Sequence, residues 1–233
     1  MEDVFYEDEV VGHVRIRRSG KANRIAIKLK EGKVILTVPQ KLQTEEGIRF
    51  LQSKRNWILA HLKKQDAVIF DENTIFRTIT FELKIMRSEL SSFHFKLTPN
   101  LLTVLCPQQL DIRSENSQAA IRMGIERAMR MEAKRILPKR LAFFAEKYQF
   151  AYSDVNIRSS KTRWGSCSSA GNISLSYFLM TLPGELIDYV LLHELCHTKE
   201  MNHSNRFWKL MDSVTDNKSK KLRAELKKYK TFI

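Results

Sequence analysis

The sequence predicts an α+β protein, with a β-rich amino-terminal half and a more helical half that contains a short β-sheet. Three observations support this fold class. Alternating apolar residues predict hairpins in the first half, helical spacing appears from about Ser114, and a nearly all-apolar helix carries HELCHTKEMNH at residues 193–203. With 43% hydrophobic content over 233 residues, the chain can bury a substantial core. We place the domain boundary between residues 1–112 and 113–233.

The first predicted hairpin is followed by a helix. Apolar and polar residues alternate from Ile25 to Leu29 and again from Val34 to Val38, Glu31 and Gly32 supply the turn, and a proline ends the pairing. A helix is expected from Thr44, because apolar residues recur there at helical spacing. The side chains expected on its apolar face are Ile48, Leu51, Ile58 and Leu62.

The same pattern recurs about 68 positions later, which predicts an internal repeat of hairpin plus helix. VILTVPQKL at residues 34–42 aligns with LTVLCPQQL at residues 102–110, so that their prolines coincide. Apolar alternation from Ile79 to Ile85 predicts a further strand in the second copy. Two unrelated hairpins are the alternative, since such β patterns are common. The candidate roles of the repeat are a scaffold, a lid over the site and a docking region for nucleic acid, and the sequence does not distinguish them.

The second half is predicted to contain helices and a smaller hairpin. Pro138 is expected to break the helical run that starts near Ser114, or to open a second helix. Val155 and Ile157 start a strand, and RWGSCSSAGNISLS at residues 163–176 predicts a hairpin. Pro183 then introduces the helix that carries HELCH, since proline is tolerated in a first helical turn.

Composition limits the compartment and the partners. The net charge of +14 predicts attraction to anions, with nucleic acid as a candidate partner and a solvated basic face as the alternative. No apolar run reaches the roughly 20 residues of a membrane span, and the acidic start MEDVFYEDEV does not resemble a secretory signal, so we expect a cytoplasmic protein without a membrane partner. The three cysteines, Cys106, Cys167 and Cys196, are expected to be reduced thiols.

The segment HELCH predicts a metal site. Residues four apart on a helix lie one turn apart, so the ring nitrogens of His193 and His197 can converge on one ion. Neutral imidazoles suit zinc, and Glu194 is placed to act as general base toward water activated by the metal. The helix is apolar nearly all round, and burying these groups without coordination would be costly. A chance match on an exposed helix is the alternative.

His203 is the expected third ligand, because a catalytic zinc usually has three protein ligands. It lies six residues after His197, the interval of the HExxHxxGxxH proteases. Glu200 replaces the glycine of that pattern, so the helix is expected to end differently, with Asn202 as a candidate left-handed residue. Cys196 is expected to belong to the core. The predicted cofactor is one zinc ion per chain.

These motifs together resemble the YgjP-like family of predicted metal-dependent hydrolases. The resemblance rests on RWGSC (163–167), IDYVLLHELCH (187–197), His203 and FW (207–208), and upstream on the basic strands and KRNWI (54–58). It implies a zincin-like catalytic half related to the SprT-like and Wss-type metallopeptidases. The residues that this assigns are His193, His197 and His203 as zinc ligands and Glu194 as base. Members of those related groups act on proteins attached to DNA, which would give the basic surface a purpose.

Residues beside the metal are candidates for substrate binding. By analogy with zincin sheets, residues 163–168 or 172–177 would align an extended peptide. Arg163 is a candidate to stabilise an oxyanion or to bind a carboxylate or phosphate. The candidates for substrate contact are Arg163, Trp164, Gly165 and Ser166. Trp164 and Trp208 also suit core packing.

The sequence favours a zinc-dependent metallopeptidase acting on protein or peptide substrates. Hydrolysis of nucleotide phosphoanhydrides at the same metal is an alternative, because basic residues near the cleft would suit phosphate. A DNA-associated protease or binding module is a further alternative. Its binding would depend on the phosphate backbone and weaken steeply with salt.

Overall fold

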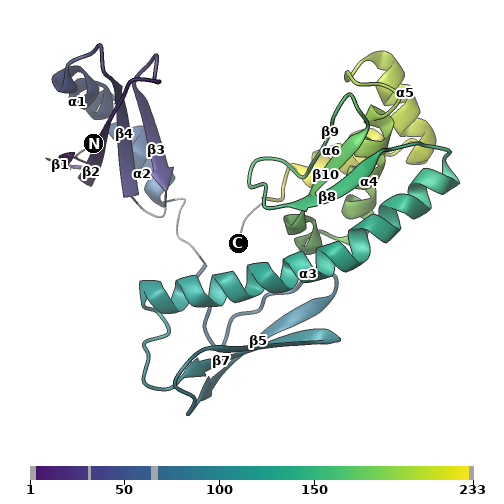
Figure 1. Cartoon of the computed structure of the whole chain (residues 1–233), viewed down its shortest axis with the longest axis horizontal. Coiled ribbons are helices and arrows are strands. Elements are labelled where there is room, and N and C mark those ends of the chain that lie inside the picture. Colours follow the sequence, from purple (N-terminus) through teal and green to yellow (C-terminus); the bar gives the residue numbers. More distant parts are fainter. Residues whose placement is uncertain (1–3, 31–32, 64–67, 231–233) are drawn as a thin grey trace. The chain divides into compact units, whose positions relative to one another are not determined.

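Two small sheets form the β-rich amino-terminal half of the computed structural model, which describes residues 4–30, 33–63 and 68–230 (Figure 1). Contacts divide the chain into two compact units, Met1–Val68 and Ile69–Ile233. One of the two sheets lies in each unit. The division therefore falls inside the region 1–112 that the sequence groups together, and the second sheet belongs to the same unit as the HELCH helix.

The first unit is a four-stranded sheet of order β1-β2-β4-β3 with two helices. Its elements are β1 (Val4–Asp8), β2 (Gly12–Ser19), β3 (Ala26–Lys30), β4 (Lys33–Pro39), α1 (Thr44–Ser53) and α2 (Arg55–Lys63). The predicted pairing of β3 with β4 is confirmed, while the turn at Glu31 and Gly32 lies outside the described residues. One predicted helix is two helices, and the side chain of Leu62 is also outside the description. Alternate side chains of β2 and β4 pack with Leu51 and Ile58 into a core of their own.

The second sheet, of order β5-β7-β6, repeats the arrangement of β2, β3 and β4. Its strands are β5 (Phe81–Ser88), β6 (His94–Thr98) and β7 (Asn100–Pro107). In each copy the central strand pairs with one parallel and one antiparallel neighbour. The predicted alignment extends to the register, because Ile27 pairs with Leu36 and Phe95 pairs with Val104. Ile79 lies outside β5, which begins two residues later than the alternation suggested.

The turn after the central strand is also repeated. The backbone N–H of Leu42 donates to the carbonyl of Pro39, and that of Leu110 donates to the carbonyl of Pro107. In each copy an arginine donates to backbone carbonyls of this turn: Arg18 to Gln40, and Arg87 to Pro107 and Leu110. This agreement favours a true repeat over two unrelated hairpins.

Helix α3 (Glu115–Lys147) runs from the second sheet to the carboxyl-terminal half (Figure 1). The prediction that Pro138 breaks this run or opens a second helix is wrong, because the helix continues through it. Proline removes one N–H and crowds the carbonyl four residues earlier. That residue, Lys134, is exposed, so water can satisfy its carbonyl. None of the helices in the described residues is both long and apolar enough to cross a membrane.

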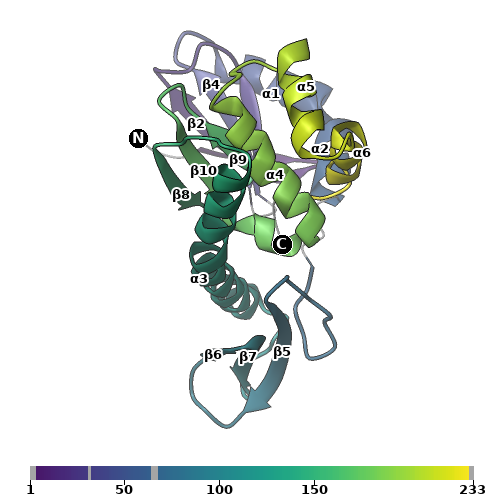
Figure 2. The same cartoon turned by 90° about the vertical axis from the view of Figure 1, so that its right-hand side faces the viewer.

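Helix α4 (Gly184–His197) lies between a third sheet and two short helices (Figure 2). The sheet has the order β8-β10-β9, and the helices follow α4 in the chain. These elements are β8 (Asp154–Arg158), β9 (Gly165–Cys167), β10 (Asn172–Ser176), the 3₁₀ turn η1 (Tyr177–Thr181), α5 (Asn205–Val214) and α6 (Ser219–Leu226). The predicted hairpin is confirmed by the antiparallel pairing of β9 with β10.

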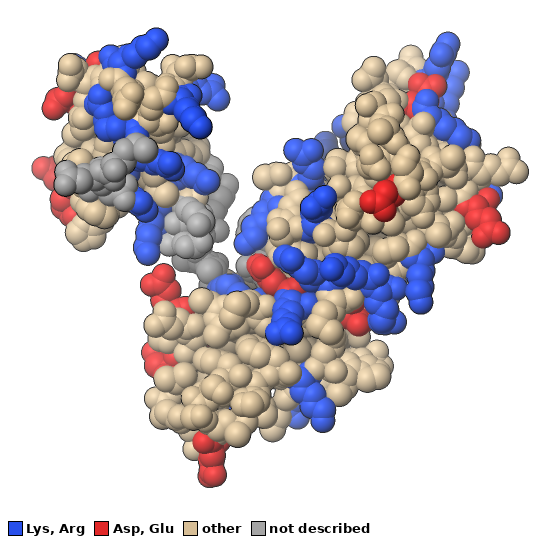
Figure 3. Space-filling view, viewed as in Figure 1, with Lys and Arg blue, Asp and Glu red and all other residues tan. Residues whose placement is uncertain are grey.

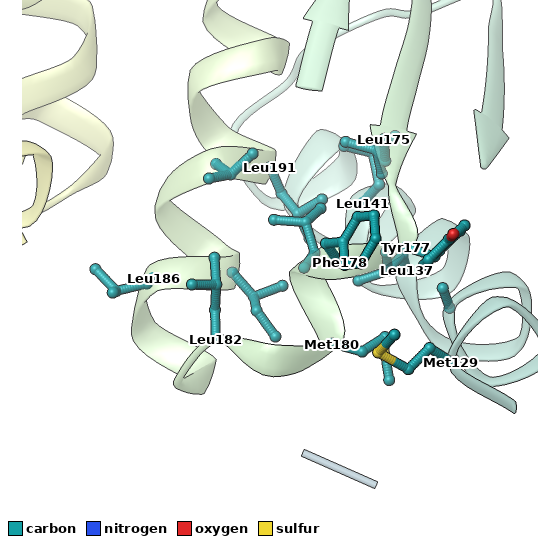
Figure 4. Packing of buried hydrophobic residues seen from close by; sticks show 14 of the residues in the cluster. Met129, Leu137, Leu141, Leu175, Tyr177, Phe178, Met180, Leu182, Leu186 and Leu191 are labelled. Carbon is teal, nitrogen blue, oxygen red and sulfur yellow. The ribbon is translucent and has the colours of Figure 1, made fainter. Parts of the chain in front are cut away.

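The core of this unit surrounds α4. Figure 4 shows buried side chains of one cluster that come from three elements: Leu186 and Leu191 of α4, Phe178 of η1, and Leu137 and Leu141 of α3. All five side chains are buried. Each contributes roughly 1.5–3 kcal/mol of hydrophobic free energy relative to an exposed position. Helix α4 is therefore held by packing and provides a firm base for the residues at its end.

Candidate metal centre

Three histidine side chains converge at the end of α4. The Nε2 atom of His193 lies 3.2 Å from that of His197 and 3.1 Å from that of His203. Ligand atoms of the three residues all lie within 4.8 Å of one another. A tetrahedral zinc ion with Zn–N bonds of about 2.0–2.1 Å separates its nitrogen ligands by roughly 3.3–3.4 Å. The three side chains therefore fit a metal ion of this kind.

Backbone contacts orient one of these rings. The Nδ1 atom of His197 lies 3.1 Å from the carbonyl oxygen of Glu200. An N–H on Nδ1 that donates to this carbonyl leaves the Nε2 lone pair available to a cation, as is usual for metal-binding histidines. In contrast, Nδ1 of His193 is buried and makes no hydrogen bond to the described residues. Ring packing holds His193 instead, with Tyr189 at 6.0 Å and Phe207 at 4.9 Å between ring centroids.

Burial favours the neutral forms of His193 and His197. It lowers the pKa of His193 to about 3, and the neighbouring His197 and His203 add to this effect. Burial also lowers the pKa of His197, although the hydrogen bond to the Glu200 carbonyl acts in the opposite direction. Since a metal ion binds the neutral imidazole, protons compete poorly with a cation at this site near neutral pH.

The chain reaches His203 without a glycine. Helix α4 ends at His197 with Thr198 as its C-cap, so the predicted end at Asn202 is wrong. The backbone N–H groups of Lys199 and Glu200 both donate to the carbonyl of Cys196, which tightens the last turn. Neither Glu200 nor Asn202 has a positive φ, so ordinary backbone geometry suffices and position 200 has no need of glycine.

Two adjacent aromatic residues of α5 support the histidines. The ring of Phe207 stacks on His197 at a centroid distance of 4.6 Å, and the ring of Trp208 stacks on His203 at 5.8 Å. The guanidinium of Arg223 lies over the ring of Trp208, 4.8 Å from its centroid. Trp208 therefore packs against the core, as the sequence suggested, and also borders the site.

Glu194 faces strand β9 and is only 5% exposed. A Cβ atom placed on Gly165 would lie 2.6 Å from its Oε1 atom and 2.7 Å from its Cγ atom. Position 165 must therefore lack a side chain if this carboxyl group is to keep its place. Burial raises the pKa of Glu194 to about 8, while the positive charge of Arg163 opposes the rise. A cation bound beside it would favour the ionised form.

A cavity of about 400 Å³ opens over His193, His203 and Glu194. Aromatic and basic side chains line much of the remaining wall: Trp164, Tyr189, Trp208, Tyr229, Arg163, Arg223 and Lys227. Three of the four predicted substrate contacts, Arg163, Trp164 and Gly165, line this cavity. The fourth, Ser166, lines a smaller cavity of about 220 Å³ that shares Arg163 and Gly165 with the first.

Sequence reasoning missed several residues of the site. Tyr189 lies four residues before His193, so the helical period that links the histidines also indicates this position. Arg223 and Lys227 come from α6 and its end, and no sequence spacing relates them to α4. Their position depends on the packing of α6 against α4.

The cysteines lie apart from the histidine cluster. Cys106 and Cys196 are buried free thiols, as expected. Cys167 is partly buried on β9, where burial raises the pKa of its thiol and the nearby Glu194 adds to the rise. Its protonated form is therefore favoured near neutral pH.

The site has the composition of a metal-dependent hydrolase centre, with three converging imidazoles, a buried carboxyl group and an adjoining cavity. The chain matches the family described as YgjP-like, metallopeptidase domain, over residues 23–229, and it belongs to this family. A comparison with curated proteins gave no match.

Two solved structures are similar to part of the chain. The metallopeptidase zymogen abylysin of Pyrococcus abyssi is 25% identical, and the metallopeptidase zymogen jannalysin of Methanocaldococcus jannaschii is 19% identical. Each match covers 40% of this chain and 94% of the other chain, with a TM-score of 0.36.

Proposed function

We propose that this protein is a zinc-dependent metallopeptidase in which His193, His197 and His203 hold the ion and Glu194 is the general base. The convergence of three Nε2 atoms carries the proposal. Membership of a metallopeptidase-domain family supports a peptide bond as the target. Zinc, when bound, supplies a Lewis acid that polarises the substrate carbonyl and promotes the ionisation of water.

Glu194 moves the proton in this proposal. Its carboxylate takes a proton from the attacking water and gives it to the nitrogen of the leaving amine, so the C–N bond breaks without release of an amide anion. The first step needs the ionised form, which a neighbouring cation favours. The second step needs the protonated form, which burial favours by raising the pKa to about 8.

Strand β9 is the candidate to align the substrate. It is an edge strand, whereas β10 pairs on both sides and has no free edge for a peptide. Of the two predicted segments, residues 163–168 are therefore the better candidate. An extended peptide added beside β9 would lie next to Gly165, which contacts Glu194 and borders the cavity.

Replacement of Glu194 by glutamine tests the catalytic role. Glu194→Gln keeps the size of the side chain but removes the proton acceptor, so peptide hydrolysis should fall by roughly 10²–10⁴-fold. Zinc content should stay near one ion per chain, measured by elemental analysis of protein purified without added metal. Glu185→Gln, an exposed change in the first turn of the same helix, is the control and should leave turnover unchanged.

Two outcomes would contradict the proposal. Full activity of Glu194→Gln on casein or peptides would remove Glu194 as the base. Wild-type protein that takes up no zinc or other divalent cation would remove the metal site itself.

Basic residues at the cavity favour a second candidate, the hydrolysis of a nucleotide phosphoanhydride. Arg163, Arg223 and Lys227 line the cavity, and none forms an ion pair with a carboxylate of the described residues. Guanidinium groups bind phosphate well. A panel of casein, peptides and nucleoside triphosphates, each with and without chelator, separates the two reactions.

A docking surface for nucleic acid stays a prediction. Figure 3 shows basic side chains gathered along α3, and a solvated surface of a protein with a net charge of +14 also has this appearance. A mobility assay at low and at higher salt tests it, because contacts to phosphate weaken steeply with salt.

A further inference from the structure

The smaller cavity, of about 220 Å³, lies on the face of the β8-β10-β9 sheet that points away from the core. Two arginines and four serines line it: Arg158, Arg163, Ser160, Ser166, Ser174 and Ser176. Gly165 and Leu175 complete the wall, and no carboxylate belongs to it. The lining therefore combines fixed positive charge with hydroxyl groups.

Strand register explains why these side chains gather. Ser166 pairs with Ser174 across the β9–β10 hairpin, and Arg158 pairs with Ser176 across β8 and β10. Directly paired residues turn their side chains to the same face of a sheet, and alternate residues turn to the other face. Ile173 accordingly is fully buried in the core, while the serines on either side of the hairpin face the cavity.

The polar groups of the cavity have capacity to bind a ligand. The hydroxyl groups of Ser166 and Ser174 are partly buried and make no hydrogen bond within the described part of the chain. Neither Arg158 nor Arg163 forms an ion pair with a described carboxylate. Two guanidinium groups beside free hydroxyls are the chemistry that binds an oxyanion, either a carboxylate or a phosphate group.

The cavity adjoins the candidate active site, because two residues line both cavities. Arg163 lines both cavities, and Gly165 lines both while also contacting Glu194. A peptide added beside β9 would turn every second side chain to the face that carries Ser166. The alternate side chains of the peptide would turn to the opposite face, toward α4 and the histidines.

We propose that this cavity, formed by Arg158, Arg163 and the four serines, is a specificity pocket for an oxyanion-bearing side chain of the substrate. The pocket rests on the proposed peptidase function and on alignment of the peptide along β9. It selects peptides that carry an acidic or phosphorylated residue at a fixed position from the scissile bond. The position is fixed because the sheet register determines which peptide side chain faces Ser166.

Matched peptides test the pocket by turnover. One parent peptide is made with glutamate, glutamine, phosphoserine or serine at each position near the cleavage site. A charged group at one position should raise kcat/KM about tenfold or more over its neutral partner. Arg158→Gln should abolish this gain while it retains turnover of the neutral peptide. Whether glutamate or phosphoserine gives the larger gain identifies the oxyanion.

Two further variants guard against a simple folding defect. Ser174→Ala should reduce the charge preference several-fold without a charge change. Arg127→Gln, an exposed substitution on α3 outside both cavities, should leave the preference intact. Equal turnover of charged and neutral peptides at every position would overturn the pocket and leave the peptidase function standing.

Binding measurements separate the pocket from the peptidase function. The same peptides, labelled with a fluorophore, are titrated with Glu194→Gln protein by fluorescence anisotropy. Tighter binding of the charged peptide, lost when Arg158→Gln is added, supports the pocket even if the wild-type protein cleaves no peptide. Equal affinities for charged and neutral peptides would overturn it whatever the turnover results are.

Discussion

Single side chains decide the chemistry at the end of α4. The buried carboxyl group of Glu194 has its place because Gly165, in a neighbouring strand, contributes no side chain. The histidines differ in their support, since His197 is oriented by a backbone carbonyl while His203 is exposed and rests on Trp208. The position of the proposed general base thus depends on one glycine that is not itself a reactive group.

Replacement of Gly165 by alanine should therefore reduce turnover more than it reduces stability. The new methyl group would lie 2.6 Å from Oε1 of Glu194 and displace the carboxyl group. A misplacement of a catalytic group by about 1 Å can cost about 10²-fold in rate. We therefore expect kcat to fall by roughly this factor. Zinc content should not change, because the three atoms nearest to the new methyl group all belong to Glu194 and none to a histidine.

Gly184→Ala is the matched control. A Cβ atom at this first residue of α4 meets only a side-chain nitrogen of Arg140 at 3.7 Å, an ordinary contact. Its turnover should remain close to that of the wild type. Equal losses in the two alanine variants would show that the effect of Gly165→Ala is not specific to Glu194.

Local sequence spacing explains how much of the site could be predicted. The histidines of α4 are related by the helical period, and His203 follows after a short turn, so their proximity depends on few nearby residues. The turn itself was predicted wrongly at Asn202, because hydrogen bonds to the Cys196 carbonyl end the helix earlier. Gly165 entered the candidate list only as a substrate contact. Its role beside Glu194 requires the packing of β9 on α4, which no spacing reveals.

Elements distant in sequence are joined by specific polar contacts, and Asp8 at the end of β1 is a clear case. Its carboxylate accepts hydrogen bonds from the backbone N–H groups of Val10 and Val11 and from the side chain of Arg55 in α2. The Asp8 side chain is fully buried. Burial acts to raise the pKa of Asp8, but the hydrogen bond from Arg55 and those from the two N–H groups outweigh it and hold the pKa below its ordinary value.

Asp8→Asn should destabilise the first unit in a pH-dependent way. Loss of the charge-assisted bonds should cost about 1–3 kcal/mol of unfolding free energy near neutral pH. Because the folded pKa lies below the unfolded one, this contribution is complete above the unfolded pKa and is lost as the pH falls through the folded pKa. The difference between wild type and variant should therefore be larger at about pH 7 than at about pH 3.

Urea unfolding of the full chain at these two pH values, followed by circular dichroism, measures the difference. Glu7→Gln changes an exposed neighbour in the same strand and should have little effect at either pH. A difference that persists unchanged in acid would show that the charge of Asp8 is not its source.

Errors in predicting elements have physical causes of the same non-local kind. A proline such as Pro138 would destabilise an isolated helix. Helix α3 nevertheless continues, because Ile125, Leu137 and Leu141 pack into the core on both sides of the proline. Strand β2 was missed because β4, with which it pairs in parallel, is separated from it in the sequence by β3. The antiparallel pairings of β3 with β4, β6 with β7 and β9 with β10 were predicted, whereas that of β1 with β2 was missed.

The chain divides into two units because each copy of the repeat belongs to a different hydrophobic core. The first copy forms its own core with Leu36, Leu51 and Ile58. The second copy shares one core with α3 and α4, so that Leu83 and Leu191 belong to the same cluster. The sequence shows two similar copies but not this difference in packing. A boundary between the repeat region and the hydrolase half was therefore the natural sequence prediction, and the contacts divide the chain between the copies instead.

This division predicts that residues 69–233, expressed alone, fold and bind zinc. Their core cluster contains no residue of the first unit, and the three histidines, Glu194 and both cavities also lie within them. The shortened chain should unfold cooperatively, and its zinc affinity in a chelator competition should stay within about threefold of the full chain, because a binding site of unchanged geometry keeps its free energy. A shortened chain that binds no zinc, or that unfolds without a cooperative transition, would show that the second core depends on the first unit.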